Sequence, residues 1–239
     1  MSFRDNSGCK RRGRVTAVGD KHRNVRTDDG YILKSVPVVR LRRARDDVLA
    51  LETRLDVSLG SDRQDGPFFR EFFKAYRQEY RARWLYEKVH NRDNLDRFLA
   101  KARVATSDFR WVHYMGHGKQ LGLRRCRLEL THGQVDLPED ASIFGGLTGR
   151  TIVLDCCDVG ISPYVLYRIL DASEAEAVFA YNGEVQDRQT RLAGSMLYDI
   201  MLTQPWVKPR AVAEMVNEAL RRLGVAFGGK HHLLTVATW

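Results

Sequence analysis

The sequence lacks the features that define several special classes of protein. No stretch of its 239 residues approaches the roughly 20 unbroken apolar residues of a membrane-spanning helix, and the N-terminal residues lack the apolar core of a signal peptide. Proline is scarce, with 6 residues, and 44% of the chain is hydrophobic, which excludes collagen-like repeats and wholesale disorder. We therefore expect a soluble, cytoplasmic protein with a buried core and no membrane partner.

Cysteine is scarce as well. The four cysteines include the adjacent pair Cys156 and Cys157 and do not form the framework of a small disulfide-rich domain. In a reducing compartment they remain thiols, so individual cysteines are candidates for chemistry. The adjacent residues His231 and His232 do not predict a metal site, because neighbours on a strand point to opposite faces. We expect neither a metal nor another cofactor.

Acidic residues are scarce only at the N-terminal end. Residues 1–45 contain 13 Lys or Arg and 4 Asp or Glu, a net charge of +9, whereas the other 194 residues contain 26 of each. Short β-forming runs between polar turns predict that residues 1–40 are a small, basic, β-rich segment. Two interpretations stay open for it: a partly flexible, solvated extension, or a surface that binds nucleic acid or an acidic partner.

Predicted strands and helices alternate from residue 83 to the C-terminus. The predicted strands cover residues 84–89, 109–115, 151–154, 177–181 and 232–237. Helices with an apolar face are predicted between most of these strands, including one from about residue 191 to 203. This alternation predicts a mainly parallel sheet that is covered by helices on both faces.

Two helices are predicted upstream of residue 83. Asp46 and Asp47 suit the positive first turn of a helix, and Leu49, Leu51 and Leu55 would form its apolar stripe. The second helix follows residue 67 and carries an aromatic stripe, which we expect to lie in the core rather than to stack on bases. This stripe consists of Phe68, Phe69, Phe72, Phe73 and Tyr76.

Two of the predicted strands end in residues that can carry chemistry. The first is followed by the segment His113–Gly118 (HYMGHG), and the second by the segment Asp155–Gly160 (DCCDVG). Ligands gather at the carboxyl ends of strands in open α/β sheets. A cysteine and a histidine on neighbouring strand ends supply a thiolate nucleophile and its proton-transfer partner. The N–H of Gly118, with no side chain beside it, can approach a developing oxyanion.

These two segments resemble the motifs of caspase-like cysteine peptidases. The first is similar to the H-Y-S-G-H-G segment of metacaspases, and Ile152–Cys157 (IVLDCC) is similar to their strand that ends in D-C-C-H-S-G. CHAT-domain proteases carry a related second motif, L-S-A-C-x-T-G. The resemblance covers residue 83 to the C-terminus and extends toward residue 36. It implies a caspase-like three-layer α/β/α sandwich with a mainly parallel sheet, which we assign to residues 41–239.

The resemblance also implies roles for individual residues. His117 matches the catalytic histidine and Cys157 the nucleophile, with the N–H groups of Gly118 and Cys157 as the oxyanion hole. Asp155 and, more remotely, Asp47 match acidic residues of the pocket for the residue before the scissile bond, which implies cleavage after Arg or Lys. The loop after residues 177–181 matches a substrate-lining loop, whose polar residues are Asn182, Glu184 and Asp187.

Some positions depart from the metacaspase pattern. Asp158-Val159-Gly160 stands where metacaspases have His-Ser-Gly and is nearer to the CHAT form. We expect the Asp158 carboxylate to face solvent, because an inward carboxylate would raise the pKa of the adjacent thiol. For Cys157 the alternative role is a buried structural thiol, for His117 a satisfied polar residue at a strand end, and for Asp155 a helix or loop cap.

Two functions from different classes therefore stay open. The first is a cysteine endopeptidase that acts on a protein or peptide substrate through a His117–Cys157 dyad, either alone or after an activating partner has ordered its loops. The second is a catalytically silent, caspase-like scaffold whose basic N-terminal segment binds nucleic acid or an acidic partner. Salt-dependent binding that survives the loss of Cys157 would favour the second function.

Overall fold

A six-stranded sheet forms the centre of the protein. The computed structural model describes residues 2–4, 10–18, 22–27, 32–37, 46–53, 65–76, 82–104, 107–224 and 234–239. The sheet has the order β13–β12–β11–β7–β5–β6. Its strands are β5 (Asp47–Glu52), β6 (Trp84–Lys88), β7 (Phe109–Met115), β11 (Thr151–Asp155), β12 (Ala177–Tyr181) and β13 (Leu234–Thr238). All neighbours run parallel except β13, which is antiparallel to β12, so the predicted mainly parallel sheet is confirmed.

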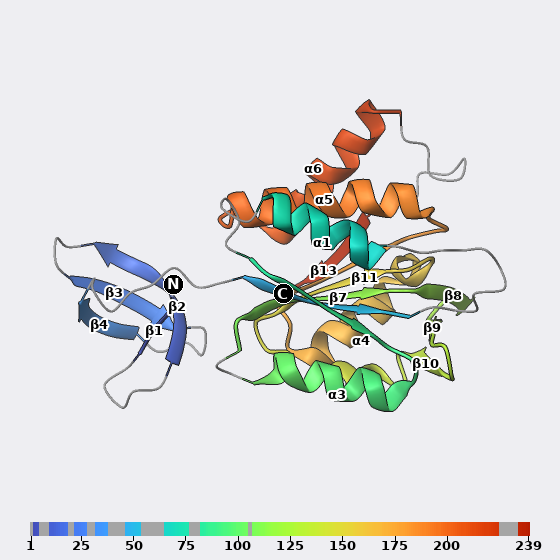
Figure 1. Cartoon of the computed structure of the whole chain (residues 1–239), viewed down its shortest axis with the longest axis horizontal. Helices are drawn as coiled ribbons and strands as arrows, with labels where there is room; N and C mark the ends of the chain where they lie inside the picture. The colour runs from blue at the N-terminus through green and yellow to red at the C-terminus, as the bar shows by residue number, and fades with distance from the viewer. Residues whose placement is uncertain are drawn as a thin grey trace.

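Helices cover both faces of this sheet (Figure 1). On one face lie α1 (Asp65–Ala75), α5 (Asp187–Thr203) and α6 (Pro209–Arg222), and on the other lie α3 (Arg92–Arg103) and α4 (Pro163–Ser173). Alternate strand residues point to opposite faces, so Val153 joins the core under α5 and α6 while Leu154 joins the core over α3 and α4. The three-layer α/β/α sandwich is confirmed.

Local sequence signals explain where several helices begin. The side chain of Ser162 accepts a hydrogen bond from the Val165 N–H, and Pro163 occupies the first turn of α4, which is a favourable start for a helix. In α1, Phe69 and Phe73 of the predicted aromatic stripe are buried in the core, whereas Phe68 and Tyr76 are exposed. Helix α5 begins at Asp187, four residues before the predicted start.

The predicted helix at residues 46–55 is wrong, because Asp47–Glu52 form strand β5 instead. This strand lies between β6 and β7, and all six of its residues are buried. A strand that is covered on both faces has a nearly continuous run of apolar residues, which in β5 is residues 48–51. Leu49 and Leu51 share one face, whereas Val48 and Ala50 share the other, so the leucines follow the two-residue period of a strand. Leu55 lies outside the described residues.

Two smaller antiparallel sheets complete the description. Strands β8 (His117–Gly122), β9 (Arg125–Glu129) and β10 (Gln134–Leu137) form a three-stranded sheet that follows β7. Strands β1 (Ser2–Arg4), β2 (Lys10–Val18), β3 (His22–Thr27) and β4 (Ile32–Pro37) form a separate four-stranded sheet. The short 3₁₀ helices η3 (Ala141–Phe144) and η4 (Val159–Ile161) lie before and after β11.

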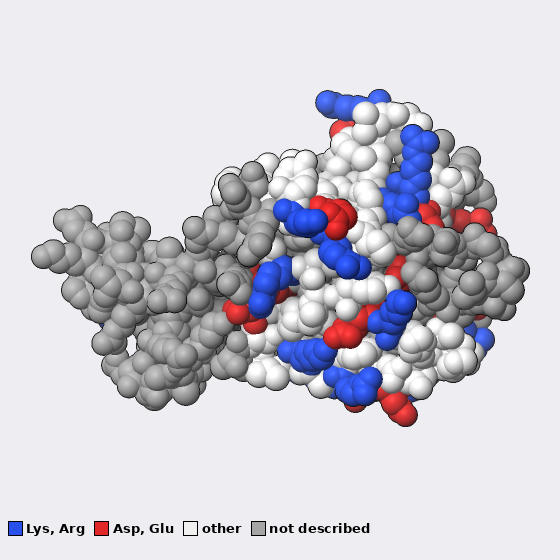
Figure 2. Space-filling model, viewed as in Figure 1, with Lys and Arg blue, Asp and Glu red and all other residues white. Residues whose placement is uncertain are grey.

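The surface of the larger part of the protein mixes charges of both signs. On the face shown in Figure 2, Lys and Arg side chains lie interspersed with Asp and Glu, in agreement with the balanced charge of residues 46–239. No helix among the residues described here is both long and apolar enough to cross a membrane.

Candidate active site

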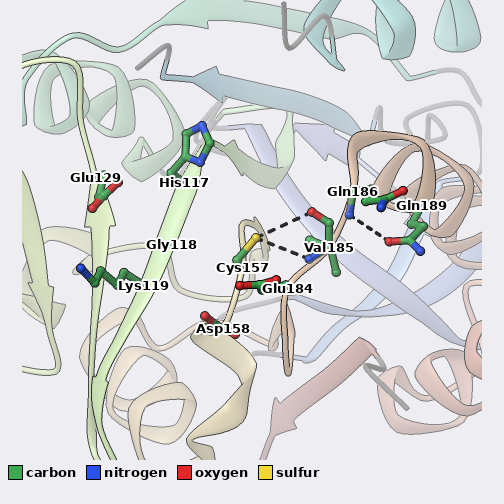
Figure 3. Close-up of a pocket in the computed structure, with 10 residues that line it drawn as sticks. All are labelled: His117, Gly118, Lys119, Glu129, Cys157, Asp158, Glu184, Val185, Gln186 and Gln189. Carbon is green, nitrogen blue, oxygen red and sulfur yellow. Dashed lines mark hydrogen bonds between the residues drawn. The ribbon is translucent and has the colours of Figure 1, made fainter. Parts of the chain in front are cut away.

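The two sequence motifs meet at one edge of the large sheet. Strands β7 and β11 are parallel neighbours, with Met115 opposite Asp155, so both strands end at the same edge. The chain then continues into β8 from the first strand and into η4 from the second. His117 and Cys157 line the same cavity of about 370 Å³. Its walls come from β8 and β9, from the segment after β11, and from the loop between β12 and α5 (Figure 3).

Glycines allow the two motifs to approach each other. A Cβ atom on Gly118 would lie 2.2 Å from the carbonyl oxygen of Cys157, and one on Gly116 would lie 2.4 Å from Oγ1 of Thr53. Both distances are too short for any side chain, so only glycine fits at either position. The Gly116 N–H also donates a hydrogen bond of 3.1 Å to the Asp155 carbonyl. The backbone of the first motif therefore packs directly against the segment that carries Cys157.

The two adjacent cysteines differ in their surroundings. Cys156 is fully buried in the core, whereas Cys157 is half-buried and lines the cavity. The Val185 N–H donates to the Cys157 Sγ at 3.4 Å, and the thiol donates to the Val185 carbonyl at 3.7 Å, as the dashed lines in Figure 3 show. A thiolate keeps the first of these bonds and gives up the second, so the Val185 N–H can stabilise the charged sulfur.

Asp158 also lines the cavity. Its backbone adopts the left-handed conformation, with φ of 65°, and its N–H donates a hydrogen bond of 3.0 Å to the Gly183 carbonyl. The side chain is half-buried and belongs to the cavity wall. The left-handed turn at Asp158 places this carboxylate beside the cavity (Figure 3).

Asp155 lies beneath the cavity rather than in its wall. Its side chain is buried, and its Oδ2 lies 3.5 Å from Nε2 of the buried His113. The other ring nitrogen, Nδ1, shares a hydrogen bond of 2.8 Å with the Tyr198 hydroxyl. Burial first, and then the negative charge of Asp155, raise the pKa of Tyr198 well above its ordinary value. The structure therefore joins Asp155 to a buried polar group on the α5 side of the sheet.

Asp47 lies at the other end of its strand. It is the first residue of β5 and is buried, and its carboxylate accepts hydrogen bonds of 2.9 and 2.6 Å from the Arg83 side chain. The carboxyl end of β5, which faces the candidate site, is at Glu52. The structure does not bring Asp47 to the cavity, because the first strand of the large sheet begins at this residue rather than ending before it.

The loop after β12 contributes to the cavity in part. Glu184 lines it, whereas Asn182 and Asp187 lie outside its wall. Asp187 is the first residue of α5, where a carboxylate favours the positive end of the helix. Of the predicted site residues, the structure thus brings together His117, Gly118, Cys157 and Glu184, and it leaves Asp155, Asp47, Asn182 and Asp187 outside the cavity wall.

Sequence reasoning missed three residues of the cavity, which are Lys119, Glu129 and Gln189. Val185 and Gln186 belong to the loop that the sequence analysis identified as substrate-lining. Glu129 stands directly opposite His117 in the register of β8 and β9, and directly opposed residues of an antiparallel pair share a face. That register follows from the hairpin geometry and not from any motif. Gln186 and Gln189 form a reciprocal cap at the start of α5, a pattern of polar residues three apart that the sequence does offer.

The ionisable side chains of the cavity are mainly acidic. Glu129, Asp158 and Glu184 carry carboxylates, and Lys119 is the one Lys or Arg in the described wall. This excess of negative charge favours a cationic group in the cavity. In the part of the chain that the structure describes, no group of three or more His, Cys, Asp or Glu side chains is arranged to hold a metal ion.

Comparisons with known proteins identify the fold. No protein-family model and no curated protein matches the sequence. Among solved structures, the chain is similar to the Drosophila initiator caspase Dronc, with a TM-score of 0.53 and 13% sequence identity over 82% of this chain and 81% of that chain. At so low a sequence identity, the structural similarity establishes the architecture and does not show the activity. The order of its strands and helices and this match together show that the chain has a caspase-like α/β fold.

Proposed function

We propose that the chain is a cysteine endopeptidase with a catalytic dyad of His117 and Cys157. One observation carries the proposal. The histidine and the cysteine of two separate motifs, on the ends of two neighbouring parallel strands, line a single cavity and are both only half-buried. A nucleophile and a proton-transfer group at one accessible site are the minimum that peptide hydrolysis by a thiol needs.

The proposed reaction has two halves. The Cys157 thiolate attacks the scissile carbonyl carbon, and the resulting oxyanion accepts hydrogen bonds from the N–H groups of Gly118 and Cys157. The C–N bond then breaks while the His117 imidazolium gives its proton to the departing amine, which leaves an acyl-enzyme. In the second half, His117 takes a proton from water, the hydroxide displaces Cys157 from the acyl group, and the thiolate and the imidazolium are restored.

Neighbouring groups support both members of the dyad. The Val185 N–H points at the Cys157 sulfur, which favours the thiolate over the thiol. Glu129, opposite His117 in the strand register, adds a carboxylate to the same cavity wall as the histidine. No third residue has to touch the substrate, since β8 and its pairing with β9 fix the backbone position of His117.

The charge of the cavity supports cleavage after Arg or Lys. Glu129, Asp158 and Glu184 line the same cavity as Cys157, and charge pairing with carboxylates selects a basic side chain. In this proposal the preference rests on these residues and not on Asp155, which is buried against His113. The loop that carries Val185 offers backbone groups with which an extended peptide can pair.

Peptide hydrolysis tests the proposal directly. Fluorogenic peptides with Arg, Lys, Asp or Leu before the scissile bond are offered to the full chain, to Cys157→Ala and to the matched control Cys156→Ala. We expect cleavage after Arg and Lys that is lost in Cys157→Ala and kept in Cys156→Ala. If no peptide is cleaved and Cys157 also resists a thiol alkylator, the free chain is not an active peptidase and the proposal fails for it.

A further inference from the structure

The ionisable residues of the cavity lie on two sides of Cys157. His117, Lys119 and Glu129 belong to β8 and β9, whereas Glu184 belongs to the loop between β12 and α5. Figure 3 shows the first group on one side of the sulfur and the loop on the other. The cavity therefore has a β8 side and a loop side, and Lys119, the one Lys or Arg in the described wall, lies on the β8 side.

The alternation of residues along β8 puts Lys119 on the same face of the strand as His117. Alternate residues of a strand share a face, and Gly118 lies between the two on the other face. In the proposed reaction the N–H of Gly118 donates to the oxyanion. Lys119 is thus one residue beyond an oxyanion donor and next to the histidine on its face of the strand.

The ammonium group of Lys119 is available to an incoming anion. The side chain is exposed, and it forms neither an ion pair nor a hydrogen bond with any residue that the structure describes. The residue directly opposite it on β9 is another cation, Arg127. Arg127 is already bound to Asp136 through hydrogen bonds of 2.6 and 3.3 Å, so of these two cations Lys119 is the one that lacks a carboxylate.

Glu129 does not neutralise Lys119. The two residues occupy diagonal positions of β8 and β9 rather than opposed ones, and no ion pair joins them. Asp136, through its hydrogen bond first and then its charge, raises the pKa of Arg127, and the charge of Glu129 adds to this effect. The carboxylate of Glu129 therefore acts on Arg127, which leaves the charge of Lys119 uncompensated.

The proposed reaction fixes the direction in which a peptide crosses the cavity. The acyl carbon bonds to Cys157, and the departing amine has to lie within hydrogen-bond reach of His117. The residues after the scissile bond consequently lie on the β8 side, and the residues before it lie on the loop side. Lys119 then faces the leaving part of the substrate, whereas Glu184 faces the acyl part.

We propose that Lys119 selects substrates that carry a carboxylate on the leaving side of the scissile bond. This inference rests on the proposed peptidase function and adds a second specificity element to it. The carboxylate belongs either to Asp or Glu at the first or second position after the scissile bond, or to the free carboxyl terminus of a short substrate. An ammonium group binds a carboxylate through charge-assisted hydrogen bonds. The cavity then favours cleavage between a basic and an acidic residue.

Internally quenched peptides and the full chain test this proposal. Every peptide carries Arg before the scissile bond, and Asp, Asn or Lys occupies the first or the second position after it. We expect kcat/KM for the Asp peptide to exceed that for the Asn peptide about two- to fivefold, the size of a partly exposed ion pair. The ratio should fall toward unity at about 500 mM salt, where exposed charges are screened.

Substitutions of Lys119 locate the effect. Lys119→Gln should remove the preference for Asp over Asn, Lys119→Arg should keep it, and Lys119→Glu should reverse it in favour of the Lys peptide. The matched control Lys88→Gln removes the same charge from an exposed position of β6 outside the cavity wall and should leave the preference unchanged. Each result is a ratio of two substrates for one protein, so partial loss of folded protein does not alter it.

A second pair of peptides separates the two sources of the carboxylate. They end shortly after the scissile bond and differ only in a free or an amidated carboxyl terminus. A preference for Asp peptides with amidated ends identifies the acidic side chain as the recognised group, and a preference confined to free ends identifies the terminal carboxylate. The absence of any preference for a carboxylate, or an unchanged preference in Lys119→Gln, would overturn the inference.

These outcomes are distinct from failure of the peptidase proposal. If peptides are cleaved through Cys157 but Lys119→Gln changes no ratio, only the role of Lys119 is wrong. If no peptide is cleaved, the peptidase proposal fails, and the alkylation of Cys157 still tests whether Lys119 attracts a carboxylate. Lys119→Gln should then lower the rate with anionic iodoacetate, relative to neutral iodoacetamide, about two- to fivefold. An unchanged ratio of the two rates would overturn that role as well.

Discussion

Each motif contains two residues of the same type in contrasting environments: two histidines in the first motif and two cysteines in the second. His113 and Cys156 are buried, whereas His117 and Cys157 are half-exposed and line the cavity. Each pair is separated by at most four residues of chain. His113 still belongs to β7 and points under α5, and His117 comes after the turn at Gly116. In the first motif the histidine before the end of β7 is buried and the one after it lines the cavity, whereas both cysteines of the second motif follow the last residue of β11 and only Cys157 lines the cavity.

The largest effect on peptide cleavage is expected from replacing one of the two histidines by glutamine. His117→Gln should lower kcat/KM for Arg peptides at least about 1,000-fold, or about 4 kcal/mol, because the proposed dyad loses the group that protonates the departing amine. His113→Gln should instead lower the free energy of unfolding and keep most of the activity. Steady-state kinetics and denaturant unfolding measure both quantities. Comparable losses of activity in the two variants would contradict the assignment of a catalytic role to His117 and a structural role to His113.

Thiol reactivity should separate the cysteines by at least about 100-fold at pH 8. Iodoacetamide should modify Cys157 in the folded protein and reach Cys156 and Cys126 only after unfolding. Burial first, and then nearby carboxylates, raise the pKa of Cys126 to about 12, so its thiol stays protonated at this pH. Peptide mapping by mass spectrometry distinguishes these sites from Cys9, which lies outside the described residues.

The buried group around His113 should contribute to stability rather than to catalysis. Tyr198→Phe removes the hydrogen bond to Nδ1 of His113 and should lower the free energy of unfolding by about 1–3 kcal/mol. The matched control Tyr167→Phe, on the exposed side of α4, should change it by less than about 0.5 kcal/mol. Denaturant titrations measure both, and peptide cleavage by Tyr198→Phe should stay close to that of the unaltered chain.

Tyr198 also predicts a pH dependence. Its pKa in the folded protein is raised, so the folded state holds the phenolic proton more tightly than the unfolded state. The resulting stabilisation is complete below a pH of about 10 and is lost as the pH rises beyond the ordinary tyrosine pKa. Unfolding measured from pH 8 to 11 should show a decline that is smaller in Tyr198→Phe. Parallel declines in the two proteins would contradict the assignment.

The smallest effect concerns substrate preference. Glu184→Gln should lower kcat/KM for Arg peptides about two- to fivefold relative to Leu peptides, because a partly exposed ion pair contributes about 0.2–1 kcal/mol. Asp155→Asn should leave the Arg-to-Leu ratio unchanged, since Asp155 lies outside the cavity wall. The ratio is insensitive to partial loss of folded protein. A selective loss of cleavage after Arg in Asp155→Asn would contradict this prediction and would indicate that Asp155 contributes to the substrate pocket.

Much of the fold could be predicted from the sequence because strands and helices alternate with clear periods. The strands that end near His117 and Cys157 were predicted closely, since each is a short apolar run followed by glycine-containing segments. Strand β5 was not, because a strand buried on both faces shows no alternation and its leucines also fit a helix. That error carried Asp47 into the predicted pocket, although Asp47 begins the strand.

The cavity itself could be predicted only in part. His117, Gly118 and Cys157 occur in motifs, so residue types and spacing were enough to single them out. Glu129 reaches the cavity through the register of a hairpin, and Asp158 through a left-handed backbone conformation. Neither property is expressed in the residue types, because register and φ angles depend on how the surrounding elements pack.

The contact between Val185 and Cys157 ties one carbonyl of the loop to the protonated sulfur. The thiol donates to the Val185 carbonyl, so a peptide N–H that pairs with this carbonyl competes with the thiol for it, whereas the Val185 N–H can stay on the sulfur. The observed affinity for a short peptide is then its intrinsic affinity multiplied by the fraction of molecules in which that carbonyl is free. A change that frees the carbonyl would remove that penalty without adding any contact to the cavity.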